Sequence, residues 1–467
     1  MSANKPNHSP SSQHQPSGQK VPTGRLARLG HLASLAGKIA GGVLAEGAKQ
    51  LAQGQKPALQ QLLLTPANAK HLANQLSQMR GAAMKLGQLL SMDAGDVLPE
   101  ALTSILAQLR ANASPMLPSQ LATVLRTEWG ADWQQQFSHF AFAPIAAASI
   151  GQVHQANHDK GQPLAVKVQY PGISTSIDSD VDNVASLLRI SGLLPADLDL
   201  APLLAEAKRQ LHKEADYLQE AAYLARYRQH IADDQRFLIP TLYPELCTAH
   251  ILTMGFVEGV PVESLQHLPQ AQRDHLMSLL FELLFKELFV FGLVQTDPNY
   301  ANYRYNEQTQ QLVLLDFGAC RDYGSSIVDG YRQLFRALLA QHHTAQDNAT
   351  QDFTAQNSTA QNNTALLAAL RQIGYFSADI NPAQQQAVLA LVALAGDTLA
   401  SDRYDFASSD LPLRMRDAGL QLSMRHNYWH TPPVDALFLH RKMAGMFLLA
   451  KTLKAKVPLR ALLQPYV

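Results

Sequence analysis

Gln295-Thr-Asp-Pro-Asn-Tyr-Ala-Asn302 and Gln311-Leu-Val-Leu-Leu-Asp-Phe-Gly318 are the two stretches of sequence that decide how this chain folds. In the first, Asp297 and Asn302 stand five positions apart on a short polar loop. The second opens with an apolar run, residues 311–315, that is typical of a buried strand, and Asp316 follows it directly. Acidic and amide side chains of this kind can hold a divalent metal ion, and a carboxylate can orient a nucleophile.

This pattern is the one by which protein kinases carry out phosphoryl transfer. They use an Asp and an Asn in a catalytic loop and a second Asp in an Asp-Phe-Gly turn. An isolated Asp-Phe-Gly is a weak signal, because the tripeptide arises by chance at strand ends. Here an Asp-x-x-x-x-Asn precedes it with a strand between the two, and we therefore predict a kinase-like fold.

A hairpin expected upstream would supply the other half of a nucleotide site. Residues 164–169 form a strand pattern that carries Lys167, and a turn at residues 159–161 connects it to an earlier strand. The loop before that strand, residues 146–149, is rich in Ala where a kinase has Gly-x-Gly-x-x-Gly. Since Ala lacks glycine's access to positive φ and adds a methyl group, this loop should be stiffer around phosphates. An ordinary β-hairpin with a Lys at its edge is the alternative.

Two helical stretches carry further candidate residues. We expect one long helix from Leu200 to His230, with three carboxylates available to hold the Lys167 ammonium, namely Glu214, Asp216 and Glu220. Earlier in the chain, Lys85 and Gln88 share one face of a predicted helix over residues 79–92. A solvated acidic face and an ordinary amphipathic helix are the respective alternatives.

Composition limits the class of protein and its partners. The chain has 467 residues, with Lys+Arg and Asp+Glu both at 38. Its formal net charge is therefore zero, and no overall positive charge favours binding to nucleic acid. Two cysteines, Cys247 and Cys320, fit a reducing compartment better than a disulfide scaffold. No window holds about 20 apolar residues without charge, the length that spans a bilayer. The longest apolar stretch, residues 276–294, is interrupted by charges and is predicted to be a buried helix.

The remaining segments are described by their composition. Residues 1–24 are predicted to be a disordered tail, and residues 32–45 mix small and aliphatic side chains, as in a helix packed on the main body or lying on a membrane. The polar five-residue repeat at 344–365 predicts a flexible insertion between helices. His426 and His430 have helical metal-ligand spacing, but no acidic partner is adjacent and two prolines follow.

Taken together, these motifs resemble the UbiB family, also called AarF or ADCK. Its members are atypical kinase-like proteins associated with ubiquinone biosynthesis and other isoprenoid-lipid pathways. The resemblance covers residues 25–460, and its most specific parts are absent from general kinases. They are the Lys-x-Gly-Gln motif at Lys85–Gln88, the Ala-rich nucleotide loop Ala146, Ala147, Ala148 and Ser149, and the Glu-x-Asp motif at Glu214 and Asp216.

The resemblance implies a role for each matching residue. Lys167 is the phosphate-binding Lys and Glu220 its carboxylate partner, while Asp297 takes the catalytic-loop position. The implied metal ligands are Asn302 and Asp316, and Met254, before the connector, joins the Ala-rich loop and Lys167 in binding nucleotide. Lys85, Gln88, Glu214 and Asp216 would cover the groove beside the catalytic Asp. The implied cofactors are ATP or ADP with Mg²⁺.

The implied architecture is an α+β, two-lobed atypical kinase-like fold. We expect an N-terminal helical extension at 25–135, a small lobe at 136–258 and a largely helical large lobe at 259–467. The catalytic loop departs from the family pattern His-x-Asp-Pro-His-x-Gly-Asn, because Gln295, Asn299 and Ala301 replace both histidines and the glycine. This version resembles the mitochondrial coenzyme-Q branch, and a bacterial member close to that branch fits best.

The resemblance leaves two classes of function open. One is an ATP-dependent enzyme of quinone-lipid metabolism that does not phosphorylate proteins in trans. The other is a kinase-fold scaffold, nucleotide-bound or inactive, that organises partner enzymes. We expect a cytoplasmic location with peripheral contact at the inner membrane, and quinone-pathway enzymes or an isoprenoid lipid as partners besides the nucleotide.

Overall fold

The computed structural model describes residues 72–74, 76–77, 79–93, 104–105, 109, 115–190, 200–297, 299–347, 352–377, 380–426 and 432–467. The chain divides into two compact units. Unit 1 comprises residues 1–219 and 241–256, and unit 2 comprises residues 220–240 and 257–467. The expected small lobe at 136–258 therefore differs from unit 1, because residues 220–240 lie within that range but belong to unit 2.

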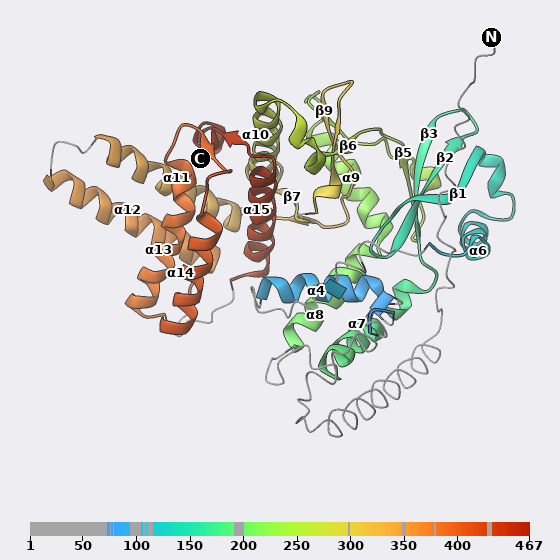
Figure 1. Ribbon diagram of the computed structural model, residues 1–467, viewed down its shortest axis with the longest axis horizontal. Coiled ribbons are helices and arrows are strands. Elements are labelled where there is room, and N and C mark those ends of the chain that lie inside the picture. The colour runs from blue at the N-terminus through green and yellow to red at the C-terminus, as the bar shows by residue number, and fades with distance from the viewer. Residues whose placement is uncertain are drawn as a thin grey trace, which may run out of the picture. The chain divides into compact units, whose positions relative to one another are not determined.

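Unit 1 is built on a four-stranded antiparallel sheet in the order β1-β2-β3-β5 (Figure 1). Its strands are β1 (Phe137–Ala147), β2 (Gly151–His158), β3 (Pro163–Gln169) and β5 (Ile251–Gly255). The predicted β2–β3 hairpin is confirmed, and Gly161 in its turn has a φ of +85°, which favours glycine. Ala146 and Ala147 end β1, so the connection that follows them, residues 148–150, is shorter than the expected Ala-rich loop.

The two faces of β3 have different partners because side chains alternate along a strand. Leu164, Val166 and Val168 are fully buried in a hydrophobic core with Leu121 and Leu125 of α6 (Pro118–Trp129). Lys167 lies between two of these residues and therefore points to the opposite face of the sheet. The sequence alternation alone thus places the predicted phosphate-binding Lys away from the core.

Helices α4 (Arg80–Asp93), α7 (Ile173–Ile190) and α8 (Ala201–Glu214) pack against one another in unit 1. The long helix expected from Leu200 to His230 is wrong, because α8 ends at Glu214 and α9 (Tyr217–His230) begins three residues later. Buried Gln169 donates to the Ala215 carbonyl at 2.6 Å. Asp216 Oδ1 accepts from the Gln219 amide at 2.9 Å and thereby caps α9.

Unit 2 contains a second four-stranded sheet in the order β4-β9-β8-β6. Its strands are β4 (Phe237–Leu238), β6 (Val260–Pro261), β8 (Tyr303–Asn306) and β9 (Gln311–Leu314), so the predicted strand before Asp316 is confirmed. Two further short strands, β7 (Leu293–Gln295) and β10 (Cys320–Asp322), pair antiparallel. The loop that carries Asp297 and Asn302 runs from β7 to β8.

Helices make up most of unit 2. The helix predicted over residues 276–294 is confirmed as far as residue 291, since α10 (Gln270–Lys286) continues into a π-helical turn (Glu287–Phe291). Residues 293–294 belong instead to strand β7. After β10 come α11 (Ser325–Asp347), α12 (Asp352–Ile373), α13 (Pro382–Gly396) and α14 (Leu411–His426). Helix α15 (Val434–Thr452) packs against α10, as does the short α16 (Leu459–Leu463).

The polar repeat at 344–365 is largely helical, which corrects the expected flexible insertion. Its first residues end α11, and residues 352–365 form the first part of α12. The repeat contains no Gly or Pro, and its recurring Ala and Gln are good helix formers. Low sequence complexity therefore did not prevent helix formation here.

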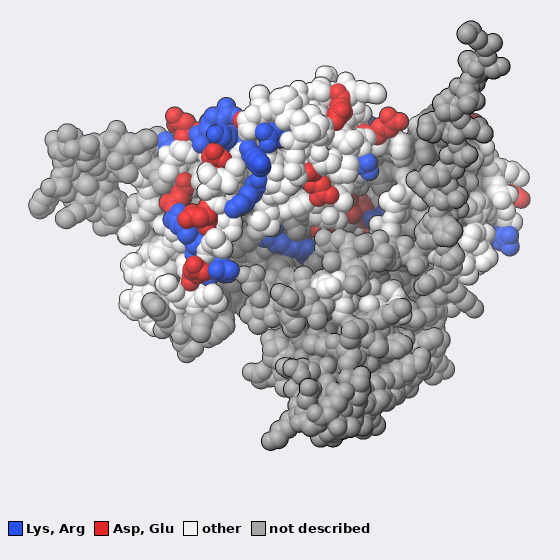
Figure 2. All heavy atoms as spheres, viewed as in Figure 1, with Lys and Arg blue, Asp and Glu red and all other residues white. Residues whose placement is uncertain are grey.

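The predicted α+β class is confirmed by the two sheets and their helices. The expectations for residues 1–24, 32–45 and His430 fall outside the described residues. In the part of the chain that is described, no helix is both long and apolar enough to cross a membrane. On the described part of the face in view, Figure 2 shows Lys and Arg interspersed with Asp and Glu.

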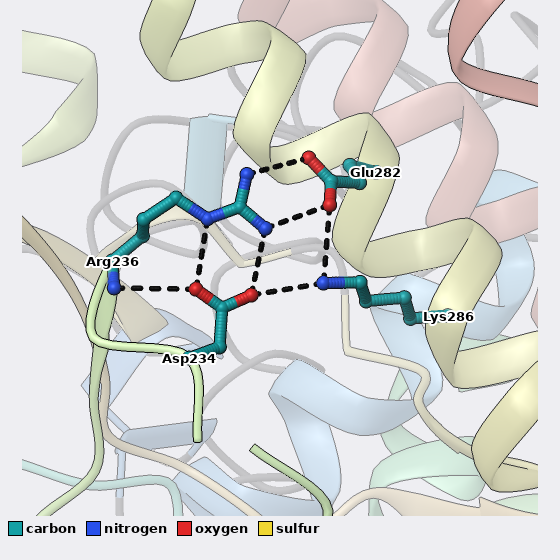
Figure 3. Close-up of polar contacts among 4 residues, drawn as sticks. All are labelled: Asp234, Arg236, Glu282 and Lys286. Carbon is teal, nitrogen blue, oxygen red and sulfur yellow. Dashed lines mark hydrogen bonds and ion pairs between the residues drawn. The ribbon is translucent and has the colours of Figure 1, made fainter. Parts of the chain in front are cut away.

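A network of charged side chains joins α10 to the segment before β4 (Figure 3). Arg236 donates to both oxygens of Glu282 and of Asp234 at 2.7–2.8 Å. Lys286 donates to Asp234 at 2.8 Å and lies 3.0 Å from Glu282, one helical turn away on α10. The hydrogen bonds from Arg236 lower the pKa of Asp234 and of Glu282, so the native state favours both charged forms.

The substitution Arg236→Gln should lower the free energy of unfolding by about 1–2 kcal/mol at pH 7, allowing for partial solvent exposure. Since both carboxyl pKa values are lowered on folding, this stabilisation is present above their unfolded values near 4 and is lost as the pH falls further. Urea denaturation at pH 7 and at pH 3.5 should show the larger loss at pH 7. Arg416→Gln, at an exposed Arg416–Asp417 pair, is the matched control. An equal loss for both variants would contradict the proposed contribution.

Candidate functional site

Unit 1 supplies the residues predicted to bind the nucleotide. Lys167 lies on β3 between Val153 of β2 and Leu252 of β5. Its Nζ lies 5.0 Å from the ring centroid of Tyr217, a fully buried residue at the start of α9. A cation over an aromatic face is attracted by the ring quadrupole, so Tyr217 helps to fix the ammonium. The sequence pattern gave no indication of this contact.

The Lys-x-Gly-Gln helix is anchored within the same unit. Lys85 of α4 forms an ion pair with Glu214 at the end of α8, and their side chains are 10% and 18% exposed. Ser149 Oγ donates to the other oxygen of Glu214 at 2.8 Å. The predicted Lys85–Glu214 pair is thus confirmed, and Glu214 also holds the loop after β1.

Close approach of α4 to this loop depends on Gly81. A Cβ added to Gly81 would lie 3.1 Å from the Ser149 carbonyl oxygen and 3.1 Å from Ile150 Cγ2, tighter than most real Cβ contacts. Because Lys85 follows one helical turn later, the same close packing brings its ammonium to Glu214.

Asp216 does not share the role of Glu214 in the way we expected. Its side chain is exposed and caps α9. The break between α8 and α9 explains the difference, because it turns Asp216 into the residue before a new helix. Gln88 lies in α4, and Met254 is buried in β5, where it pairs with Ala165.

Unit 2 supplies the predicted catalytic and metal-binding residues. Asn302 Nδ2 donates to Asp297 Oδ2 at 2.9 Å, so the two ends of the polar loop meet. The antiparallel β8–β9 hairpin then brings Asp316 close to them, since the Leu315 backbone amide donates to the Asn302 carbonyl at 3.2 Å. The spacing in sequence and the strand pairing therefore assemble one cluster from Asp297, Asn302 and Asp316.

Glu220 lies beside the Asp-Phe-Gly turn. It is buried on α9, and a Cβ added to Gly318 would lie 3.2 Å from its Oε2 and 3.4 Å from Asp316 Oδ1. Phe317 is buried against Tyr227 of α9, with ring centroids 5.1 Å apart. These contacts fix the turn against α9. Lys167 and Glu220 belong to different units, so their predicted pairing stays a prediction.

Two contacts to the catalytic loop were missed by the sequence reasoning. Arg441 of α15 lies 3.6 Å from Asp297 Oδ1 through its Nη2 and is largely buried. Thr296 Oγ1 donates to the Ala319 carbonyl at 2.7 Å, which joins the loop to the segment after Gly318. No local pattern announces Arg441, because it lies on a helix more than a hundred residues further along the chain.

The donors in this cluster are suited to a hard divalent cation. Asp316 offers carboxylate oxygens, and Asn302, whose Nδ2 is directed at Asp297, retains an amide oxygen as an acceptor. Oxygen ligands of this kind suit Mg²⁺ better than softer metals. The nearby thiol of Cys320 is neutral, because burial and the charge of Glu287 hold its pKa well above the usual value.

Comparison with known proteins assigns a family to this arrangement. The model of the ABC1 atypical kinase-like domain matches residues 108–349. The Saccharomyces cerevisiae protein "Atypical kinase COQ8, mitochondrial" is 35% identical over 429 residues, which are 91% of this chain and 81% of the relative. "Atypical kinase coq-8, mitochondrial" of Caenorhabditis elegans is 35% identical over 399 residues, which are 84% of this chain. The chain spans only 50% of that nematode relative's length.

A solved structure shares the fold of this chain. The complex of Rv3197 with erythromycin from Mycobacterium tuberculosis matches with a TM-score of 0.54 at 21% identity, covering 86% of this chain and 96% of that one. At this level of identity the likeness concerns the fold alone. The expected two-lobed atypical kinase-like architecture is confirmed.

The Lys85–Glu214 pair can be tested by a double-mutant cycle. Lys85→Met should lower the free energy of unfolding by about 3 kcal/mol, because it leaves the Glu214 carboxylate largely buried without its cation. Glu214→Gln added to this variant removes the isolated charge, keeps an acceptor for Ser149, and should recover part of the loss. Urea denaturation measures each variant, and hydrogen exchange over residues 80–93 reports on the docking of α4. Additive effects of the two substitutions would show that the pair contributes no coupling energy.

Proposed function

This chain belongs to the ABC1 atypical kinase-like family, and on that premise we propose that it binds ATP or ADP with Mg²⁺ and cleaves the γ-phosphate of ATP. The phosphate passes to water or to a small acceptor in isoprenoid-lipid metabolism, with ubiquinone biosynthesis as the pathway that the family resemblance implies. Quinone-pathway enzymes and an isoprenoid lipid are the proposed partners, with peripheral contact at a membrane. Because one of the relatives is twice as long as the matched region, this assignment is made for the matched region alone.

The observation that carries the proposal is the cluster in unit 2. Asp297 and Asn302 are hydrogen-bonded at 2.9 Å, and the β8–β9 pairing brings Asp316 to the same place. Phosphoryl transfer requires this combination, namely a carboxylate that orients the attacking hydroxyl or water and oxygen ligands for a metal ion on the phosphates. We assign the first role to Asp297 and the second to Asn302 and Asp316.

Magnesium bound by Asn302 and Asp316 would neutralise charge on the phosphate oxygens. We assign the phosphate contacts of unit 1 to Lys167 and to the residues Ala146 to Ser149. Glu220 is proposed to hold the Lys167 ammonium, and Met254 to contact the base. Arg441, whose Nη2 lies 3.6 Å from Asp297 Oδ1, attracts that carboxylate and is proposed to limit its orientation.

We further propose that the chain does not phosphorylate proteins in trans. Within unit 1, α4 is packed against the loop after β1 through Gly81, and Lys85 and Ser149 are both committed to Glu214. A helix held in this way restricts access to that loop, in contrast to the open groove of a protein kinase. Lys85, Gln88 and Glu214 are the residues we assign to this cover. Asp216, as the cap of α9, fixes the segment that follows Glu214.

A kinase-fold scaffold is the second candidate. It is favoured by the replacement of both histidines and the glycine of the family's catalytic loop by Gln295, Asn299 and Ala301. A scaffold would bind nucleotide without turnover, so the rate of ATP hydrolysis separates the two functions.

The nucleotide site is tested by Asp316→Asn. This change removes a charge that holds Mg²⁺ against the phosphates, so it should weaken Mg-ADP binding at least tenfold, or by about 1.4 kcal/mol. Titration calorimetry measures the affinity. Asp417→Asn, at an exposed pair on α14, is the control and should bind as the unmodified chain does. Equal affinity in Asp316→Asn and in the control would refute the metal site.

The reaction class is tested with radiolabelled ATP. The unmodified chain should release phosphate, faster with vesicles that contain an isoprenoid quinone, and should transfer no label to casein. Asp297→Asn should reduce phosphate release at least a hundredfold while retaining nucleotide affinity, because the carboxylate acts on the nucleophile and not on binding. Strong labelling of casein would contradict the proposal, and binding without turnover would favour the scaffold.

A further inference from the structure

Lys442 of α15 is buried beneath the catalytic loop of unit 2. Its side chain is 3% exposed, and its ammonium donates to the Gln295 carbonyl at 2.7 Å and to Gln295 Oε1 at 3.0 Å. It also donates to the hydroxyl of Tyr303. Gln295 stands two residues before Asp297, and Tyr303 directly follows Asn302. One ammonium therefore contacts both ends of the loop that carries these two residues.

The ends of the loop are also joined to each other. Tyr303 OH donates to Gln295 Oε1 at 3.0 Å, and the backbone N–H of Gln295 donates to Glu287 Oε1 at 3.1 Å. Tyr227 OH donates to the same Glu287 oxygen at 2.7 Å. Glu287 opens the π-helical turn that ends α10, and such turns often mark functional sites. The turn thus places a buried carboxylate under the start of the loop.

Charge keeps this arrangement together. Glu287 is fully buried, and its Oε2 lies 3.5 Å from the Lys442 ammonium. Burial opposes the charged form of Lys442, but the attraction of Glu287 and the contact with Tyr303 outweigh it and raise the pKa of Lys442 to about 12. The ammonium is therefore charged at every physiological pH, and each of its N–H groups has an acceptor within the site.

The position of Lys442 also determines the position of its neighbour. Arg441 precedes it on α15 and lies 3.6 Å from Asp297. Since consecutive residues of a rigid helix move together, a contact that fixes Lys442 under Gln295 also fixes the distance of Arg441 from Asp297. Both contacts come from one turn of a helix more than a hundred residues beyond the loop.

We propose that Lys442 is a positioning residue that closes the base of the catalytic loop and thereby holds Asp297 in the orientation needed for phosphoryl transfer. The effect on turnover rests on the proposed function, whereas the effect on loop order does not. Lys442 touches no reacting atom, and it acts through Gln295, Tyr303 and the backbone between them.

A purely structural role would be to neutralise Glu287. Two variants separate the possibilities. Lys442→Met removes the ammonium and leaves Glu287 buried without its cation, so the free energy of unfolding should fall. The double variant Glu287→Gln/Lys442→Met removes both charges, and the Gln retains an acceptor for Tyr227 and for the Gln295 amide. If Lys442 only neutralises Glu287, this double variant should behave as the unmodified chain.

For the double variant we expect a folded protein with an altered loop. Hydrogen exchange in the peptide covering residues 293–303 should become at least tenfold faster, because the contacts from α15 to both ends of the loop are lost. The kcat for ATP hydrolysis should fall at least tenfold while the KM for Mg-ATP stays within twofold, since misplacing Asp297 affects the chemical step. Lys451→Met, on the same helix, removes an exposed Lys that donates to the Ser409 carbonyl and is the matched control.

The results for the double variant separate a positioning role of Lys442 from simple neutralisation of Glu287. Unchanged exchange over residues 293–303 in the folded double variant would overturn the proposal, and so would a recovered kcat. If the unmodified chain hydrolyses no ATP, the proposed function fails, and the exchange measurement still decides the role of Lys442. Faster exchange in the double variant but not in Lys451→Met would support it.

Discussion

The buried pair of Lys442 and Glu287 is the interaction on which the arrangement of unit 2 around Asp297 and Asn302 depends. An ammonium and a carboxylate removed from water are costly unless each is paired and fully hydrogen-bonded. Here the acceptors are Gln295 and Tyr303, at the two ends of the loop, and the donors to Glu287 are Tyr227 and the Gln295 amide. This ion pair and its hydrogen bonds thus tie α9, α10 and α15 to the loop that carries Asp297 and Asn302.

The same principle organises unit 1 on a smaller scale. The Lys85–Glu214 pair is largely withdrawn from solvent, and Ser149 completes the hydrogen bonding of the carboxylate. Gly81 makes the pairing possible by letting α4 reach the loop backbone. Close packing and charge pairing therefore depend on each other, because a larger residue at position 81 would separate the charges.

Comparison of the expected and observed elements shows where local patterns are reliable. Alternation along β3 and the apolar run of β9 predicted these strands, since side chains on a strand alternate or are buried regardless of context. The helix expected from Leu200 to His230 is interrupted because Gln169, which is distant in sequence, bonds the Ala215 carbonyl. For the polar repeat at 344–365 the composition predicted a flexible insertion, but much of it is helical, as the propensities of Ala and Gln favour.

The sequence by itself determined the kinase-like motifs, the strand that carries Lys167, and the grouping of Asp297, Asn302 and Asp316. These follow from short spacings and from the pairing of neighbouring strands, which a hairpin enforces locally. Only the tertiary structure decided which residues support them. Lys442 bonds Gln295 across 147 positions of sequence, and Arg441 reaches Asp297 from the same helix. No local sequence pattern predicts such contacts, because the partners of a buried charge are determined by which residues lie near it in the folded chain.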